Sequence, residues 1–357
     1  MTRLIEILIS LAIVAALFIL VGIVLPSSRH VSESIETNRK MTIVRDTLTT
    51  PRRLKDWSVP ALKDPGMAWT FTGPDNGVGA TAQYSSKNDQ VGNGTWKLTK
   101  NEPNRIEYAV TDPTRGTNKR TVFTLKPTGR NNRNVEITQT YEVDYGFDLL
   151  GRYSGLYISK IGDDMKLGLG KLTNMLAGVP NYDYASDFGR EDPANLPKIV
   201  ELPAENLLTA PATVERDPDK IQLAMNNNLQ WIRKVMDANG LEAAGPVRVI
   251  TTEFAADAYS FDTVIPVRKK GETGPATEIA APTLQQNVQF VRSEAGRYAS
   301  AGFKGHMLSL AKMRDSLRAW TMVRGYETTG RPFEVWNGGV DAGFTDEGTF
   351  TLFWKLK

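Results

Sequence analysis

The sequence contains no cysteine, and this absence excludes several kinds of chemistry. A chain without thiols forms no disulfide bond, builds no thiolate metal site and has no cysteine nucleophile. Because such a chain suits an oxidising compartment as well as a reducing one, the absence does not locate the protein.

Histidine is scarce, with only His30 and His306 in the whole chain. Neither has a carboxylate or a third ligand at a useful spacing, so we expect neither a zinc site nor a Ser-His-Asp triad. Gly-x-Ser-x-Gly is absent, and no Gly-x-Gly pair lies in a strand–turn–helix unit. We therefore predict no catalytic residue, metal or cofactor. An enzyme that acts through pocket shape and a few polar groups remains an alternative.

The sequence also lacks a large excess of charge of either sign, since the net charge is only +3 at pH 7. No basic run with interleaved aromatic residues occurs, so we expect no nucleic-acid partner. The 357 residues are 41% hydrophobic, which is typical of folded globular chains and long enough for two domains.

One long uncharged run is present, from Ile7 to Leu25. At about 1.5 Å per residue it reaches roughly across a ~30 Å hydrocarbon core. A cleaved signal peptide is the alternative, but no small-x-small site immediately precedes Pro26. The flanking Arg3 and Arg29 give conflicting orientations. We predict a transmembrane anchor at residues 1–26, in a bacterial-type inner membrane, with the soluble domains in the periplasm.

Residues 27–177 follow with an edge strand, two short helices, a series of alternating strands and one long helix at 149–176. The strands are joined by Gly/Pro/Asn turns such as Gly73–Ala80 and Val91–Gly94, which is typical of an antiparallel meander. This order resembles the helix-grip fold of the START-like, polyketide-cyclase (SRPBCC) superfamily. The resemblance implies an apolar cavity between the sheet and the long helix.

Large aromatic residues with a polar tip recur on the inward faces of this domain. They suit a cavity for a lipid-like or aromatic ligand, and plain core packing is the alternative for each of them. The predicted ligand contacts are Trp69, Tyr84, Trp96, Tyr108, Tyr141 and, on the long helix, Tyr157.

Residues 178–198 contain three prolines and no periodicity, and we predict a linker. Residues 199–357 then hold two copies of one pattern, a helix, a turn, a strand, a loop and a strand. The turns are Gly240–Gly245 and Gly325–Gly330. A repeated sequence pattern of this kind indicates a repeated structural unit. Two βαββ copies predict one antiparallel sheet with two helices on one face and a groove on the other. This pattern resembles the GyrI-like effector-binding domain, which is related to the SOUL fold.

The resemblance implies an acidic anchor for cationic ligands at the start of the last strand, but Thr351 stands there. Asp262 occupies the corresponding place in the first copy. It either holds an organic cation beside aromatic walls or lies on a solvated strand edge. Glu334 is a second acidic candidate or part of an exposed strand surface. Trp336 and Trp354 are further candidate contacts, or core residues.

The predicted fold class is α+β, with a transmembrane helix, a START-like helix-grip domain and a duplicated βαββ domain. We predict a membrane-anchored protein that binds a small hydrophobic or amphipathic molecule, as a sensor or by sequestering it. A cyclase- or hydrolase-type enzyme and a structural protein of the envelope are the alternatives.

Overall fold

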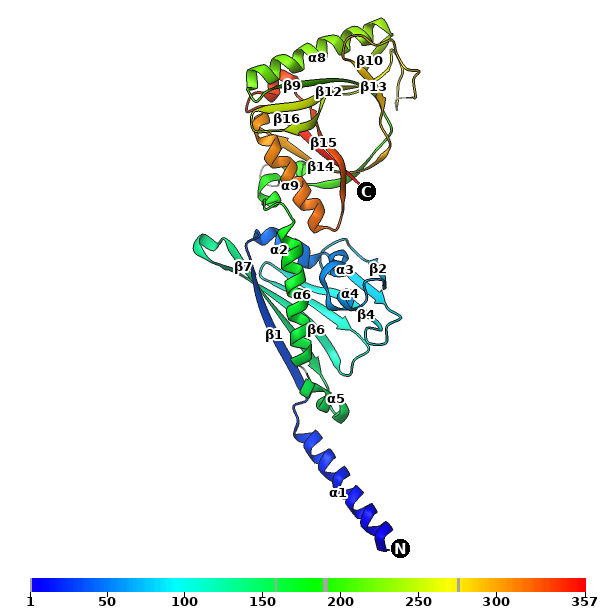
Figure 1. Ribbon diagram of the computed structural model, residues 1–357, viewed down its shortest axis with the longest axis vertical. Coiled ribbons are helices and arrows are strands. Elements are labelled where there is room, and N and C mark those ends of the chain that lie inside the picture. The colour runs from blue at the N-terminus through cyan, green and yellow to red at the C-terminus, as the bar shows by residue number, and fades with distance from the viewer. Residues whose placement is uncertain (1, 158, 189–191, 275–276) are drawn as a thin grey trace. The chain divides into compact units, whose positions relative to one another are not determined.

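The computed structural model describes residues 2–157, 159–188, 192–274 and 277–357 (Figure 1). It divides into an N-terminal unit, residues 1–179 with 323–325, and a C-terminal unit, residues 180–322 with 326–357. Each unit contains one sheet, and all strand pairings in the described residues are antiparallel. The predicted α+β class is confirmed.

The first element is α1 (Thr2–Val24), an apolar helix. Residues 3–24 of this helix are long and apolar enough to cross a bilayer. A signal sequence near the N-terminus has the same length and composition, so these properties alone do not separate the two predictions of anchor and signal peptide.

The N-terminal sheet has seven strands in the order β1-β7-β6-β5-β4-β3-β2. β1 (Ser28–Thr37) lies at one edge, as the sequence predicts, and pairs with β7 over its whole length. Alternation is clear in β5, where Ile106, Tyr108 and Val110 are buried and Ala109 is exposed. The other strands are β2 (Ala68–Thr72), β3 (Thr81–Ser85), β4 (Asn93–Glu102), β5 (Arg105–Thr111), β6 (Thr117–Thr128) and β7 (Asn134–Asp144).

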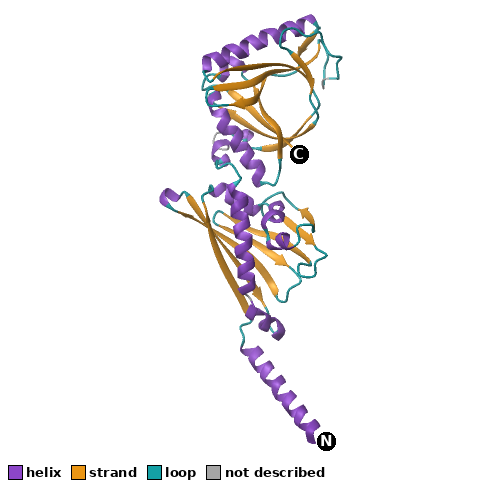
Figure 2. Cartoon of the chain, in the orientation of Figure 1, coloured by secondary structure: helices purple, strands orange, loops and turns teal. Residues whose placement is uncertain are grey.

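Helices cover one face of this sheet (Figure 2). They are α2 (Met41–Thr49), α3 (Leu54–Trp57), α4 (Val59–Lys63) and α6 (Ser159–Ala177), while α5 (Leu149–Ser154) lies at the end of the sheet and contacts α1. α6 contacts β1, α3 and α4. Its buried side chains recur at three- and four-residue steps, as on one face of an amphipathic helix. They are Met165, Leu169, Leu172 and Leu176.

The long helix predicted for residues 149–176 is divided in the structure. α5 ends at Ser154, a 3-10 turn covers Gly155–Tyr157, and α6 begins at Ser159. Gly155 lies close to its neighbours, since a Cβ placed there would be 3.1 Å from Tyr145 and 3.2 Å from Arg29. A glycine permits this close approach, which local periodicity does not reveal.

The C-terminal sheet confirms the internal duplication. Its order is β13-β9-β12-β11-β15-β16-β14-β8, which places the two copies symmetrically about the β11–β15 pair. The first copy consists of β9 (Asn206–Glu215), α8 (Pro218–Ala238), β10 (Leu241–Ala243), β11 (Arg248–Phe254) and β12 (Ala258–Lys269). The second consists of β14 (Gly296–Lys304), α9 (Leu310–Val323), β15 (Thr328–Trp336), α10 (Gly339–Gly343) and β16 (Thr349–Leu356).

The outer strands of this sheet are exchanged between the copies. β8 (Lys198–Leu202) precedes the first copy in the chain but pairs with β14 of the second. β13 (Gln289–Arg292) precedes the second copy but pairs with β9 of the first. Each outer strand therefore extends the half of the sheet that is formed by the other copy.

The strand register assigns both long helices to the same face of the sheet. Thr263, Val249 and Glu334 are paired laterally across β12, β11 and β15, so their side chains share one face. Asn228 of α8 donates to Thr263, and Arg314 of α9 donates to Glu334. We call this the helix face. The opposite face, which carries Asp262, Ile250 and Phe333 in the next lateral row, we call the groove face.

The predicted linker contains a short helix, α7 (Tyr184–Phe188), whose Tyr184 and Phe188 side chains are buried. Asp187 accepts hydrogen bonds from Ser316 at 2.5 Å and from Lys312 at 2.6 Å, both on α9. These contacts fix α7 to the C-terminal unit, although the sequence around it has no helical periodicity.

Candidate functional site

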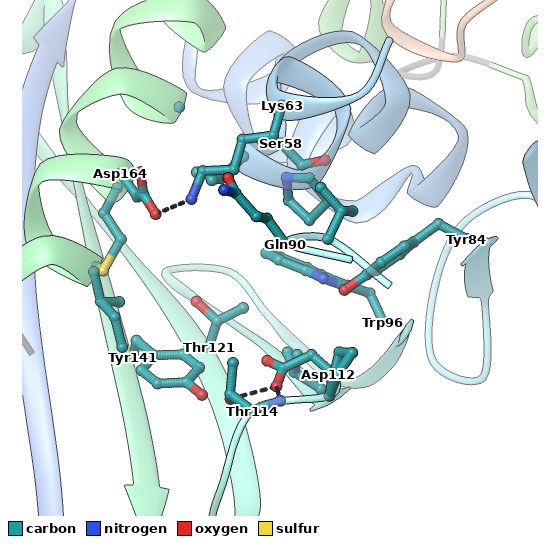
Figure 3. Close-up of a pocket in the computed structure, with 18 of the residues that line it drawn as sticks. Ser58, Lys63, Tyr84, Gln90, Trp96, Asp112, Thr114, Thr121, Tyr141 and Asp164 are labelled. Carbon is teal, nitrogen blue, oxygen red and sulfur yellow. Dashed lines mark hydrogen bonds and ion pairs between the residues drawn. The ribbon is translucent and has the colours of Figure 1, made fainter. Parts of the chain in front are cut away.

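A cavity of about 370 Å³ lies in the N-terminal unit, between the sheet and the helices α3, α4 and α6 (Figure 3). Small-molecule sites typically have volumes of about 300–1,000 Å³, so this cavity is of the right size for a ligand. The helix-grip arrangement creates it because α6 and the α3–α4 segment cover the sheet without filling the space above it.

The walls of the cavity are rich in aromatic side chains. Trp57 comes from α3, Tyr84 from β3, Trp96 from β4 and Tyr141 from β7. Trp57 and Trp96 meet edge to face with ring centroids 6.5 Å apart, an arrangement that aromatic pairs favour. Four rings from four elements give the cavity broad, mostly apolar surfaces.

Three of the six predicted contacts line this cavity, namely Tyr84, Trp96 and Tyr141. Tyr108 does not, because it is fully buried and its hydroxyl donates to the Leu48 carbonyl at 2.6 Å. Trp69 lies beside Tyr84, with ring centroids 5.6 Å apart, and is not among the lining residues. The Tyr157 side chain lies outside the described part of the structure.

The charged groups around the cavity are largely compensated by one another. Lys119 is buried and donates to the Asp112 carboxylate at 2.5 Å and to Thr114 Oγ1 at 2.8 Å. Across the cavity, Lys63 of α4 donates to Asp164 of α6 at 2.6 Å, and Figure 3 shows this pair bridging the two helices. Asp89 also lines the cavity and is exposed to solvent. Because the more buried charges are paired, the site favours a neutral ligand, since a charged ligand would lose hydration for little gain of counter-charge.

Burial keeps the phenols of the cavity protonated. Burial raises the pKa of Tyr84 to about 12, and the negative charge of Asp112 adds to the effect. The pKa of Tyr141 is raised for the same two reasons, with burial as the larger. Both hydroxyls are therefore neutral near pH 7 and are poor bases, but they can donate hydrogen bonds.

Two buried donors in the wall have no partner among the residues that the structure describes. They are the Trp57 indole nitrogen Nε1 and the Ser58 hydroxyl Oγ. Both residues line the cavity and are at least 98% buried. A buried polar group without a partner costs about 1–3 kcal/mol. Both atoms are themselves buried, so they lie behind the surface of the cavity wall.

Ser58 stands at the N-cap of α4, where serine normally accepts a backbone N–H. Its side chain makes no capping hydrogen bond. Pro60 at the second helical position has no N–H to donate, which removes one of the two usual partners. The Ser58-Val59-Pro60 order was the signal in the sequence that could have revealed this free hydroxyl, and sequence reasoning missed it. It also missed Trp57, Gln139 and Met165 as lining residues.

The C-terminal unit has a hollow of about 490 Å³ on its helix face, lined in part by Asn226, Arg233 and Trp336, and a smaller one on its groove face. It measures about 130 Å³ and is lined in part by Arg248, Ile250, Tyr298 and Phe333. Arg248 forms two hydrogen bonds to Glu205, at 2.6 and 2.8 Å, so the charge of each is matched inside the wall. A space of this size holds much less than the N-terminal cavity.

Of the predicted contacts in this unit, Asp262 lies on the groove face. It belongs to β12, which is flanked on both sides by β9 and β11, so the expectation of a strand edge is wrong. Burial raises the pKa of Asp262, and the charge of Arg331 partly opposes the shift.

The other three predicted contacts lie on the helix face. Glu334 is fully buried and bound by Arg314 through Nε–Oε1 and, at 3.1 Å, Nη2–Oε2, so the expectation of an exposed surface is wrong. Trp354 donates from Nε1 to the Arg314 carbonyl at 3.0 Å. Trp336 is 1% exposed and packs against Phe350 and Phe344. These side chains point away from the groove.

With this geometry in place, the comparisons with known proteins can be stated. Residues 28–176 match the family described as polyketide cyclase / dehydrase and lipid transport. Over these residues the chain is similar to that family. The match contains the cavity and all of its lining residues. No curated protein matches the sequence.

Solved structures show weaker similarity. The C-terminal domain of EcmrR has a TM-score of 0.36 and 17% identity, covering 45% of this chain and 96% of its own. Norcoclaurine synthase from Thalictrum flavum, in complex with dopamine and hydroxybenzaldehyde, has a TM-score of 0.32 and 15% identity, covering 41% of this chain and 87% of its own. No inference about function rests on these two similarities.

Proposed function

We propose that this protein is a membrane-anchored binding protein that holds a neutral, largely apolar small molecule in the cavity of its N-terminal unit. The observation that carries the proposal is the cavity of about 370 Å³ with aromatic rings from four elements in its walls. This space predicts a ligand with a hydrophobic body, and the Tyr84 and Tyr141 hydroxyls are available as hydrogen-bond donors to an oxygen that the ligand carries.

The family match supports the class of ligand. The family's description includes lipid transport as well as cyclase and dehydrase activity. Compensated charges, neutral phenols and aromatic walls fit a lipid-like or polycyclic molecule better than a charged metabolite. We favour sensing or sequestering over catalysis, because the phenols of Tyr84 and Tyr141 are poor bases with their raised pKa values.

The proposal assigns α1 the role of a retained, single-pass anchor and the two folded units a periplasmic position. Its length and composition support the anchor. A molecule that partitions into membranes would then be available to the cavity at the place where the protein resides.

Native mass spectrometry of the full chain, extracted from membranes in mild detergent, tests the proposal. We expect a co-purifying neutral adduct that is lost in Val110→Phe, which places a ring in the cavity. Val249→Phe, in the core of the C-terminal unit, is the matched control and should retain the adduct. An adduct retained equally by both variants would contradict the proposal, and turnover of a supplied ester or ketone would favour the enzyme alternative.

A further inference from the structure

Three large apolar side chains are exposed in the segment around α5, at the end of the N-terminal unit where α1 joins it. Phe147 is 96% exposed, Leu150 53% and Leu156 56%. We call these three residues the α5 patch. Each of them would gain free energy by leaving water for an apolar environment.

The α5 segment is bound to the C-terminal end of α1 through one buried guanidinium. Arg152 Nη1 donates to the carbonyls of Ile23 at 2.8 Å and of Gly22 and Leu25 at 3.2 Å. Its Nε and Nη2 donate to the Gly146 carbonyl, at 2.8 and 2.6 Å. A cation that satisfies the last carbonyls of a helix stabilises that end, so Arg152 both caps α1 and holds the α5 segment against it.

The contact also includes residues that precede the end of α1. The Tyr153 hydroxyl donates to the Phe18 carbonyl at 2.7 Å, and the two rings stack with centroids 4.4 Å apart. Gly22 lies against Leu149 and Tyr153, since a Cβ there would be 3.3 Å from each of them. Phe18 precedes the end of α1 by roughly 9 Å along the axis. α5 therefore lies beside the last turns of α1.

We propose that the α5 patch inserts into the interfacial layer of the bilayer that α1 spans, as a second membrane contact. This inference rests on the proposed anchoring by α1. A hydrocarbon core of about 30 Å within a bilayer of about 40–45 Å leaves an interfacial layer of several ångströms on each side. A membrane that covers α1 to its last turns reaches α5, because the two are held side by side. Phe147, Leu150 and Leu156 are the kind of apolar anchors that such a layer accepts.

The absence of cysteine makes a direct test possible, because each single-cysteine variant of the full chain takes one dye. Leu150→Cys reports on the patch. Leu167→Cys is the matched control, a leucine 58% exposed on α6, roughly 12 Å along the helix from its start; Figure 1 shows α6 running away from α5. Leu11→Cys, within α1, reports on anchoring alone. Each variant carries an environment-sensitive fluorophore and is reconstituted into phosphatidylcholine–phosphatidylglycerol vesicles.

We expect the Leu150 label to emit at shorter wavelength, with several-fold higher intensity, and to be quenched by lipids that carry a nitroxide near the headgroup. The Leu11 label should be quenched by lipids that carry the nitroxide deep on the acyl chain, because Leu11 lies near the middle of α1. The Leu167 label should emit as in water. A quenched Leu11 label with an unquenched Leu150 label would overturn the α5 contact while leaving the anchor intact. If neither is quenched, anchoring and the α5 contact both fail. Equal quenching at Leu150 and Leu167 would also overturn a contact confined to the patch.

Discussion

The two units share a plan, an antiparallel sheet with helices on one face, but they differ in what lies between sheet and helix. In the N-terminal unit this layer contains a cavity of about 370 Å³ with aromatic walls. In the C-terminal unit the part of the layer under α9 is filled by Glu334, Arg314 and Trp354. Beside α8, Trp336 borders a more polar hollow of about 490 Å³.

This difference shows that a helix-covered sheet is not in itself a binding site. Where side chains from the helix reach the sheet and satisfy its polar groups, the layer becomes a core. Where a void with apolar, aromatic walls remains, the layer has room for a largely apolar ligand. The following four comparisons of variants test that distinction, beginning with the largest expected effect.

Removing the acidic partner of one ion pair in each unit should lower the stability of the two units by unequal amounts. Glu334→Gln leaves the buried Arg314 without its counter-charge and should destabilise the C-terminal unit by about 3–5 kcal/mol. Asp164→Asn removes the partner of Lys63 at an exposed site, where the Lys63 side chain is 41% exposed and the Asp164 side chain 35%. This change should cost less than about 1 kcal/mol. Hydrogen exchange of the most protected amides in each unit measures both effects. Equal losses would contradict the distinction.

Two buried serines offer a second comparison. Ser316→Ala removes a hydrogen bond to the Asp187 carboxylate and should destabilise the C-terminal unit by about 1.5–3 kcal/mol. Ser58→Ala removes a hydroxyl that has no partner in the described structure, so stability should be unchanged or slightly higher. Chemical denaturation checks the two variants. A destabilised Ser58→Ala variant would show that its hydroxyl serves the fold.

Added volume should be tolerated in one unit and costly in the other. Val249→Phe inserts a ring into the filled core and should cost about 1–3 kcal/mol. Val110→Phe directs the same ring toward the cavity, where space exists, and should leave stability within about 1 kcal/mol while abolishing ligand binding. Thermal unfolding of the two variants, side by side, measures the difference. A strongly destabilised Val110→Phe variant would mean that the cavity has no room.

The smallest expected effect concerns the pH dependence of the groove face. Burial raises the pKa of Asp262 above its ordinary value of 3.8, so the native state binds its proton more tightly than the unfolded state. The resulting stability is present below pH 3.8 and is lost as the pH rises through the raised pKa. Asp262→Asn should remove this dependence. Unfolding measured from pH 3 to pH 7 tests it, and an unchanged slope in the variant would exclude Asp262 as the source.

Local patterns in the sequence predicted the elements well. Alternation along β5, the proline that ends α2 and the paired glycine turns of the duplicated half all act over a few residues, so they can be recognised without tertiary structure. The edge position of β1 and the common face of α8 and α9 followed from these patterns.

Features that depend on distant partners could not be predicted in this way. A glutamate within an alternating strand suggests an exposed face, and only the arrival of Arg314 from α9 explains the burial of Glu334. Tyr108 is core because Leu48, far away in sequence, accepts its hydroxyl. The exchange of β8 and β13 is likewise a choice of partner between copies.

The most direct test of the account is hydrogen exchange of the full chain with and without its co-purified ligand. We predict that the ligand protects amides of β4, β5 and α6, which border the cavity, and leaves β11, β12 and β15 of the C-terminal unit unchanged. Protection confined to β11, β12 and β15 would contradict the account and assign the ligand to the groove instead.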